Sequence, residues 1–166
     1  MSGEILRAVF DCNIFIQVLL NPNSVAAKCL NAVRRGKAEL FVSKDTLAEI
    51  GDVVLRPNIL SRLPNADVEK IEAFIEDVLS LSTLIRSVPK SFKLIRDPKD
   101  EIIIDLAIKA EAEYIVSRDK DLLDLMTGFT DDCKEFRQRF RHLKIVEPLE
   151  FLRIVKEKEL SLTELN

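Results

Sequence analysis

Carboxylates are concentrated in one stretch of the chain, from residue 96 to residue 121. The stretch holds five aspartates, Asp97, Asp100, Asp105, Asp119 and Asp121. An apolar helical pattern follows Asp100, and a short strand pattern ends shortly before Asp119. Because the C-terminal ends of parallel strands line the ligand crevice of an open α/β sheet, Asp119 is expected there, and the preceding loop could bring Asp100 to the same edge. Aspartates that converge without cysteine or histidine nearby favour a hard divalent cation bound through oxygen.

Two more carboxylates have a positional argument elsewhere in the chain. Asp11 ends the apolar run Ile5–Phe10, which is typical of a strand buried on both faces of a parallel sheet. Glu49 lies close to the edge of the apolar face of a helix that Ser43 can cap, where a glutamate is usually solvated. Taken singly, each acid could instead cap a helix or be solvated at the surface.

Together, the four carboxylates Asp11, Glu49, Asp100 and Asp119 predict a specific chemistry. Like charges about 4 Å apart repel each other by about 4 kcal/mol at an intermediate effective dielectric constant, and a divalent cation would turn this cost into attraction. Such a cation lowers the pKa of a bound water and can bridge the oxygens of a phosphodiester. Magnesium keeps several waters and takes few direct carboxylates. The natural substrate class is therefore a phosphate ester, cut by hydrolysis.

The elements that must position these acids alternate between strand and helix. Strand patterns occupy residues 5–10, 39–42, 83–88, 114–116 and 143–146. Helical patterns occupy residues 14–20, 25–35, 44–55, 67–81, 99–112, 131–141 and 148–159, with a short helix ending near residue 125 and turns over 58–65. This alternation predicts an α/β fold in which a mostly parallel central sheet is covered by helices on both faces.

Length and composition limit the class of protein. With 166 residues, 47% of them apolar, the chain is expected to form one packed domain over residues 1–160, followed by a frayed tail over 161–166. No apolar run approaches the roughly 18 residues of a membrane span, and the start lacks a signal-peptide pattern, so we expect a cytoplasmic protein. Three cysteines without CxxC spacing argue against a disulfide framework or a zinc site. A net charge of −3 weighs against a generally basic nucleic-acid binder, but it does not exclude a nuclease whose acidic site offsets basic residues elsewhere.

Four short motifs, taken together in their order and spacing, resemble the PIN domain, a family of metal-dependent ribonucleases with a Rossmann-like fold. They are Asp11-Cys12-Asn13-Ile14-Phe15, the helix start Ser43–Ile50 (SKDTLAEI), Asp97-Pro98-Lys99-Asp100, and the run from Ile115 to Leu123. The match spans residues 5–125, and the ending from Glu147 to Leu152 is also similar. The subgroup that the chain resembles most is a set of bacterial PIN proteins regarded as toxin components of toxin–antitoxin pairs.

The resemblance implies a divalent-metal-dependent endoribonuclease that uses Mg²⁺ or Mn²⁺, with Asp11, Glu49, Asp100 and Asp119 as metal ligands and catalytic acids. The implied supporting residues are Asn13, Ser117, Asp97 and Asp121, and Asp105 is a further acid that could supplement the metal site. Basic residues would have to hold the RNA backbone. The candidates are Lys44, Arg56, Arg118 and Lys120, with Arg137, Arg139 and Arg141 as a further group. The implied partners are RNA, an antitoxin protein and a second copy in a homodimer.

Alternatives to an active nuclease remain open at this point. A non-catalytic PIN module acting as an RNA-binding or scaffold subunit is one, although retention of all four acids argues against it. A haloacid dehalogenase-type phosphatase would want D-x-D after the first strand, and Asp11-Cys12-Asn13 lacks the second aspartate. A receiver domain would want paired acids near the start, which are missing. Two departures from the subgroup are the longer, more basic segment Met126–His142 and Glu101 beside Asp100, which leaves open which acid faces the metal.

Overall fold

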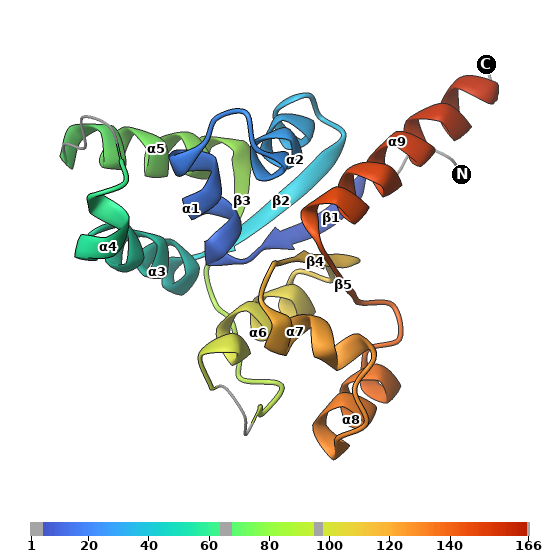
Figure 1. Cartoon of the computed structure of the whole chain (residues 1–166). Helices are drawn as coiled ribbons and strands as arrows, with labels where there is room; N and C mark the ends of the chain where they lie inside the picture. Colours follow the sequence, from blue (N-terminus) through green and yellow to red (C-terminus); the bar gives the residue numbers. More distant parts are fainter. Residues whose placement is uncertain (1–4, 64–67, 95–97, 166) are drawn as a thin grey trace.

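The computed structural model, which describes residues 5–63, 68–94 and 98–165, contains a five-stranded parallel sheet in the order β3-β2-β1-β4-β5 (Figure 1). The strands are β1 Leu6–Phe10, β2 Ala38–Ser43, β3 Ser82–Ile85, β4 Tyr114–Val116 and β5 Lys144–Val146. Apolar residues dominate the three central strands because both of their faces are covered. The predicted α/β class with a parallel sheet is confirmed.

The strand order reverses at β1, which pairs with β2 on one side and with β4 on the other. Val9 lies opposite Phe41 of β2 and opposite Ile115 of β4. Just beyond β1, the backbone N–H of Asp11 donates to the carbonyl oxygen of Val116 at 2.9 Å, so the chain leaves both strands at the same edge. In doubly wound sheets, this reversal point opens the crevice where ligands bind.

Helices cover both faces of the sheet, as Figure 1 shows. The helices are α1 Cys12–Leu20, α2 Val25–Arg34, α3 Lys44–Val54, α4 Pro57–Leu60, α5 Val68–Leu81, α6 Glu101–Lys109, α7 Lys120–Leu123, α8 Asp131–Arg139 and α9 Pro148–Glu164, with 3-10 turns at Pro98–Asp100 and Asp124–Met126. One face packs against α1, α2, α3, α5 and α9, and the other against α6, α7 and α8.

The core is divided by the sheet into two apolar clusters. Alternation along β1 sends Ala8 and Phe10 into the cluster under α1 and α9, whereas Val9 enters the cluster under α6. Edge-to-face aromatic pairs occur in both clusters, with ring centroids 5.7 Å apart for Phe10–Phe151 and 5.6 Å apart for Phe92–Phe136. Both faces of β1 are therefore anchored, which fixes the position of the residues that follow it.

Several element boundaries differ from the sequence prediction. The helix expected over 99–112 is a 3-10 turn followed by α6, which ends at Lys109 because the backbone reverses through Glu111, whose φ is 54°. The turn region expected after residue 57 begins with the short helix α4, which has Pro57 in its first turn, where its fixed φ suits a helix start. Helix α9 continues to Glu164, past the predicted end at residue 159.

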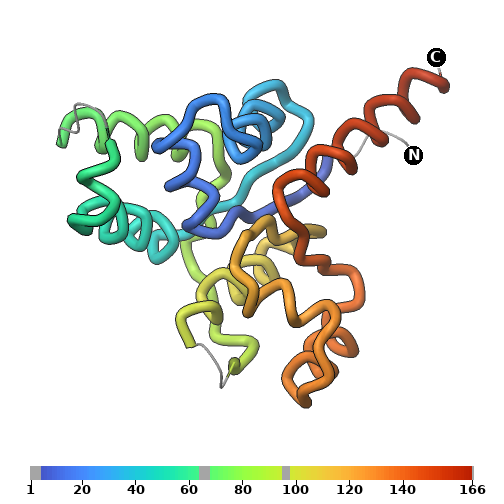
Figure 2. Tube along the Cα trace, viewed as in Figure 1, coloured from blue at the N-terminus to red at the C-terminus, as the bar shows by residue number. Residues whose placement is uncertain are grey.

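The segment between β3 and α6 crosses from one side of the sheet to the other, as the green-to-yellow trace in Figure 2 shows. Two carboxylates hold it in place. Asp105, which is only 6% exposed, accepts hydrogen bonds from the backbone N–H groups of Ser91 at 2.9 Å and Phe92 at 3.1 Å. Glu101 accepts from the N–H of Leu94 at 2.7 Å. These two acids therefore anchor the loop that leads to Asp100.

The basic segment after residue 126 folds around α8, and two of its arginines have structural contacts. Arg137 donates to the carbonyl oxygens of Leu125 and Gly128, both at 2.8 Å. Arg139 donates to the carbonyl of Ser91 at 3.1 Å. These contacts give Arg137 and Arg139 a structural role, and their contact with RNA stays a prediction. Within the described residues, no helix is both long and apolar enough to cross a membrane.

Candidate functional site

Asp11 sits at the start of α1 with its carboxylate fixed on both oxygens. Its Oδ1 accepts from the N–H of Cys12 at 2.8 Å, as an N-cap does. Its Oδ2 accepts from the hydroxyl of Ser117 at 2.7 Å and from the side-chain amide of Asn13 at 3.2 Å. Asp11 is 8% exposed and Ser117 is completely buried. Asn13 and Ser117, which were predicted as supporting residues, therefore both contact the Asp11 carboxylate, and their functional role stays a prediction.

Asp119 follows β4 and is linked to Asp11 through the same serine. Its backbone N–H donates to the Ser117 hydroxyl at 3.0 Å, and its Oδ1 accepts from the N–H of Asp121 at 2.8 Å, which caps α7. Its Oδ2 makes no hydrogen bond with any residue that the structure describes. Ser117 therefore joins the two acids that end β1 and β4, and one oxygen of Asp119 is left to face a ligand.

Asp100 and Glu49 reach the site from two other elements. Asp100 ends the 3-10 turn before α6 and is only 7% exposed. Because its neighbour Glu101 is bonded to the N–H of Leu94, Asp100 is the acid of that pair that lines the site. Glu49 lies in α3 and is half-buried, and its side chain lines the same cleft, the position that the family resemblance implies.

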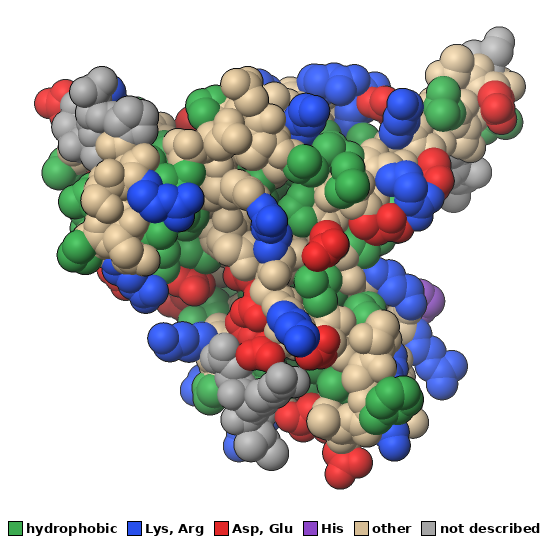
Figure 3. Space-filling view, viewed as in Figure 1, with side chains coloured by type: hydrophobic (Ala, Val, Ile, Leu, Met, Phe, Trp, Pro, Cys, Tyr) green, Lys and Arg blue, Asp and Glu red, His purple; other side chains and the backbone are tan. Residues whose placement is uncertain are grey.

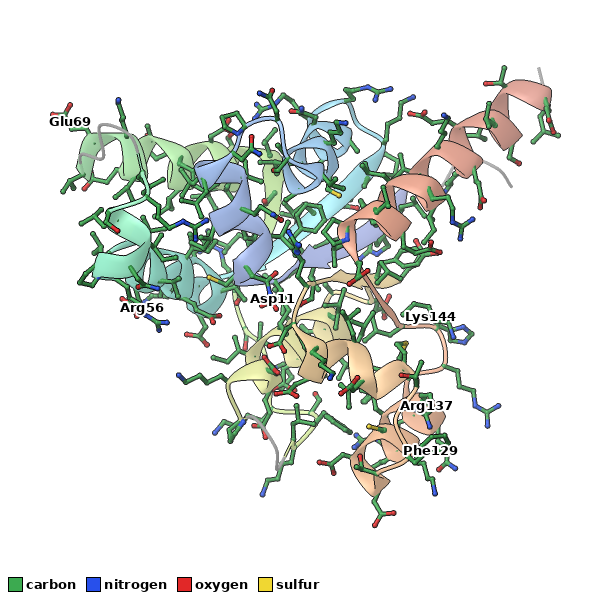
Figure 4. The ribbon with its side chains drawn as sticks, viewed as in Figure 1. Asp11, Arg56, Glu69, Phe129, Arg137 and Lys144 are labelled. Carbon is green, nitrogen blue, oxygen red and sulfur yellow. The ribbon has the colours of Figure 1, made fainter. Side chains whose placement is uncertain are left out.

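The four carboxylates share one open cleft of about 750 Å³. Figure 3 shows acidic side chains gathered near the middle of this face of the molecule, between α1 above and α6 and α7 below. In Figure 4, Asp11 lies at this junction, where β1 passes into α1. The other lining residues are Cys12, Asn13, Ile16, Gln17, Leu20, Asn21, Val53, Ile59, Arg62, Lys99 and Arg118. The cleft is therefore lined by the four carboxylates, which we call its acidic floor, by an apolar wall and by the cations Arg62, Lys99 and Arg118.

The pKa of the Cys12 thiol depends on the charged groups of the cleft. Burial, as the largest cause, together with the carboxylates of Glu49 and Asp11 raises the pKa of its thiol to about 12, and the Arg56 guanidinium opposes this shift. The thiol is therefore protonated near neutral pH, and carboxylate and amide oxygens are the strongest donors in the cleft. Glu49 and Asp11 therefore both act on the same thiol, although they come from different parts of the chain.

The donor set fits a hard divalent cation that keeps part of its water shell. Within the residues described, no three histidine, cysteine, aspartate or glutamate side chains form a preassembled cation cage. Four carboxylates nevertheless line the cleft, and two of them are oriented by Ser117. Magnesium is usually bound by one or two carboxylates together with waters and substrate phosphate oxygens, which this arrangement can accommodate.

Two of the other acids predicted for the site, Asp121 and Asp105, are outside the lining of the cleft. Asp121 lines a separate pocket beside Leu125 and Cys133, and its backbone N–H donates to the carboxylate of Asp119. Asp105 is buried against the 91–92 backbone, which removes it as a supplementary metal ligand. Asp97 lies outside the described residues.

The cations predicted to hold RNA are divided between the cleft and its surroundings. Arg118 lines the cleft, whereas Lys44 and Lys120 are exposed outside it. Arg56 also lies outside the lining, at the end of α3 in Figure 4, although its charge acts on Cys12. The sequence analysis missed two lining cations, Arg62 and Lys99. Lys99 could have been found from its place beside Asp100, but Arg62 reaches the cleft only through the turn after α4.

Comparison with known proteins identifies the family. The profile of the PIN domain matches residues 7–121, so the chain belongs to the PIN domain family. The chain is 31% identical over 147 residues to the protein of Methanocaldococcus jannaschii named Uncharacterized protein MJ1680, and the alignment covers 89% of this chain and 90% of that protein. The crystal structure of PAE2754 from Pyrobaculum aerophilum has the same fold, with a TM-score of 0.56 and 13% identity over 95% of this chain and 94% of that one.

Family membership adds a general expectation to the geometry. PIN domains are generally nucleases and typically use divalent metal ions. The matched region contains all four cleft carboxylates.

Proposed function

We propose that the protein is a divalent-metal-dependent endoribonuclease that hydrolyses phosphodiester bonds of RNA, with Asp11, Glu49, Asp100 and Asp119 as its catalytic acids and metal ligands. One observation carries the proposal: four carboxylates from four separate segments of the chain line one cleft at the reversal point of the sheet. Carboxylates crowded in this way destabilise the fold unless a cation or a positive ligand offsets their repulsion, so they need a functional explanation.

The chain's own residues would divide the work between holding the cation and placing the phosphate. Mg²⁺ or Mn²⁺, when bound, lowers the pKa of a water and neutralises phosphate charge. Asp11 and Asp119 are the oriented pair, since Ser117 bonds to the carboxylate of one and the backbone of the other. Asn13 and Ser117 hold the Asp11 carboxylate in its rotamer, and such supporting contacts typically affect metal affinity or activity about 10- to 100-fold.

The cations of the cleft support an RNA backbone as the substrate. Arg62, Lys99 and Arg118 line the same cleft as the acids, and they could contact phosphates on either side of the bond to be cut. Lys44, Arg56 and Lys120 are exposed around it and would extend this contact along the strand.

The biological setting that we propose follows the subgroup resemblance: a cytoplasmic toxin that acts as a homodimer and is restrained by an antitoxin protein covering the acidic cleft. The rival function is a non-catalytic PIN module that binds RNA or serves as a scaffold. The retention of all four acids in one cleft favours the nuclease, because a scaffold has no use for their mutual repulsion.

The proposal is tested by incubating end-labelled single-stranded RNA with protein that has been stripped of metal by EDTA. We expect no cleavage until Mg²⁺ or Mn²⁺ is added back. Because water, and not the ribose 2′-hydroxyl, is the proposed nucleophile, the products should carry no 2′,3′-cyclic phosphate. Cleavage that continues in EDTA, or cyclic phosphate ends, would contradict the mechanism. Metal-independent RNA binding without any cleavage would support the scaffold function instead.

A further inference from the structure

We propose that the outer half of the cleft is a nucleobase subsite in which the side-chain amide of Gln17 reads the edge of an unpaired base, with adenine as the best match. The inference rests on the proposed ribonuclease function, because it places the base beside the phosphate held at the acidic floor. It adds a specificity-determining residue and the chemical class of its ligand.

One face of α1 lines the cleft. Asn13, Gln17 and Asn21 line it at intervals of four residues, which is one side of a helix. Asn13 bonds to the Asp11 carboxylate at 3.2 Å. With a rise of about 1.5 Å per residue, Gln17 lies about 6 Å further along the axis than Asn13. A ligand whose phosphate reaches the acidic floor would therefore extend past Gln17.

An apolar wall lines the cleft together with Gln17. Ile16 and Leu20 come from α1, Val53 comes from α3 and Ile59 comes from α4, and all four line the cleft. Leu20, Val53 and Ile59 are half-buried, so part of their surface is left to a ligand. Aliphatic walls of this kind hold an unstacked base by covering its flat faces.

The burial and hydrogen bonding of the Gln17 amide decide what it can bind. Gln17 is half-buried, and its side chain makes no hydrogen bond with any residue in the described part of the chain. The neighbouring amide of Asn21 is already used, since its Oδ1 accepts from the N–H of Asn23 at 2.9 Å. A glutamine amide places one donor and one acceptor side by side. In an unpaired strand, adenine offers the matching amino group and ring nitrogen on both its Watson–Crick and its Hoogsteen edge, whereas cytosine offers them on one edge only.

The cations of the cleft suit an RNA strand better than a peptide. Arg62, Lys99 and Arg118 line the same cleft, which favours a polyanion over a peptide as its occupant. The strand must be single, because base edges become accessible to side chains when the bases are unpaired and splayed out. The occupant with both required features is a phosphate joined to an exposed base.

The test compares equilibrium binding of fluorescent A10, C10 and U10 oligoribonucleotides in the presence of Mg²⁺, using an Asp119→Asn background so that binding is measured without cleavage. With Gln17 present, we expect A10 to bind about 5-fold or more tightly than C10 and U10, the lower end of what a bidentate amide contact discriminates. Gln17→Met keeps the length of the side chain and removes the amide. It should bring the three affinities within about 2-fold of each other.

Two further variants separate the subsite from a general loss of binding. Ile59→Ala, which trims the apolar wall, should weaken all three oligonucleotides together and leave their order unchanged. Gln138→Met, on the exposed surface of α8, is the matched control and should change nothing. An equal affinity for the three oligonucleotides in the parent protein would overturn the inference, and so would a preference that survives Gln17→Met.

Binding and cleavage can fail independently in this design. If the parent shows the Gln17-dependent preference but the wild-type protein never cleaves RNA, the base subsite stands and the nuclease proposal falls. If metal-dependent cleavage is found but Gln17→Met leaves the preference unchanged, only the subsite falls.

Discussion

At the scale of single residues, Ser117 joins the two acids of the cleft floor. Its hydroxyl donates to Asp11 at 2.7 Å and accepts from the backbone of Asp119 at 3.0 Å, and the side chain is completely buried. One small hydroxyl therefore fixes the relative position of groups that are 108 residues apart in the chain (119 − 11 = 108).

Ser117→Ala should reduce metal-dependent RNA cleavage by about 10- to 100-fold, because Asp11 loses a hydrogen bond that orients it. The free energy of unfolding should fall by about 1 to 3 kcal/mol, since a buried backbone N–H loses its acceptor. Urea denaturation and initial cleavage rates measure the two effects.

Ser24→Ala is the matched control, because Ser24 is also buried and accepts from the N–H of Ala27 at 3.1 Å, but it caps α2 away from the cleft. It should cost about 1 kcal/mol of stability with no loss of activity. Equal activity of the two serine variants would show that the Ser117 contacts do not matter for catalysis.

Residues that follow strands could be predicted from the sequence, whereas the position of Arg62, which follows a short helix and a turn, could not. Asp11 and Asp119 come directly after apolar runs, and parallel strands bring such positions to one edge. The position of Arg62 depends on how α4 packs after Pro57, which no local pattern specifies. Asp105 resembled a possible ligand in sequence because an acid on a helix looks the same whether it faces metal or backbone.

At the scale of elements, the loops that lead to the site are held by backbone contacts. Asp105 and Glu101 hold the segment before α6, and Arg137 holds the turn before α8. Gly128 lies in that turn, and its N–H donates to the carbonyl of Asp124 at 2.6 Å. The chain approaches itself closely there, so the identity of residue 128 should matter for stability.

Gly128→Ala should destabilise the protein by about 1 to 3 kcal/mol, because the added Cβ would lie 2.7 Å from the sulfur of Cys133 and 2.8 Å from the carbonyl oxygen of Asp124. Gly51→Ala, in contrast, should stabilise it by about 0.5 to 1 kcal/mol. Its Cβ would meet only Ile75 at 3.9 Å, and alanine favours the interior of α3. Urea denaturation measures both, and a stabilised Gly128→Ala protein would contradict the close packing of the turn.

The element order was predictable because buried strands and amphipathic helices have distinct periods. Helix ends were harder, since they depend on backbone reversals such as that at Glu111 and on tertiary packing. The short helix α4 was missed because its four residues show no periodicity, although Pro57 is a favourable helix start.

At the scale of the whole molecule, the fold brings acids from distant segments of the chain into one cleft. The sheet reversal and three different helical segments place Asp11, Glu49 and Asp100 there. Acids gathered in a cleft are typical of functional sites. Metal binding should therefore stabilise this protein.

Glu49→Gln should reduce the stability that the protein gains from Mg²⁺, because it removes one of the four carboxylates that line the cleft. On addition of Mg²⁺ the wild-type protein should gain free energy of unfolding in proportion to the logarithm of metal concentration, and the variant should gain less. Glu76→Gln, on the exposed side of α5, is the control and should gain as much as the wild type. A wild-type protein that is indifferent to Mg²⁺ would count against a cation site in the cleft.

The most direct test of the account compares metal-dependent RNA cleavage by wild-type protein, Asp11→Asn and Asp121→Asn. Both substitutions remove one carboxylate charge, but only Asp11 lines the cleft. We predict that Asp11→Asn lowers the cleavage rate by more than about 100-fold, since even residues that only orient a metal ligand contribute about 10- to 100-fold. Asp121→Asn should cleave within about 3-fold of wild type, because its carboxylate is outside the cleft. Full activity of a folded Asp11→Asn protein would contradict the account.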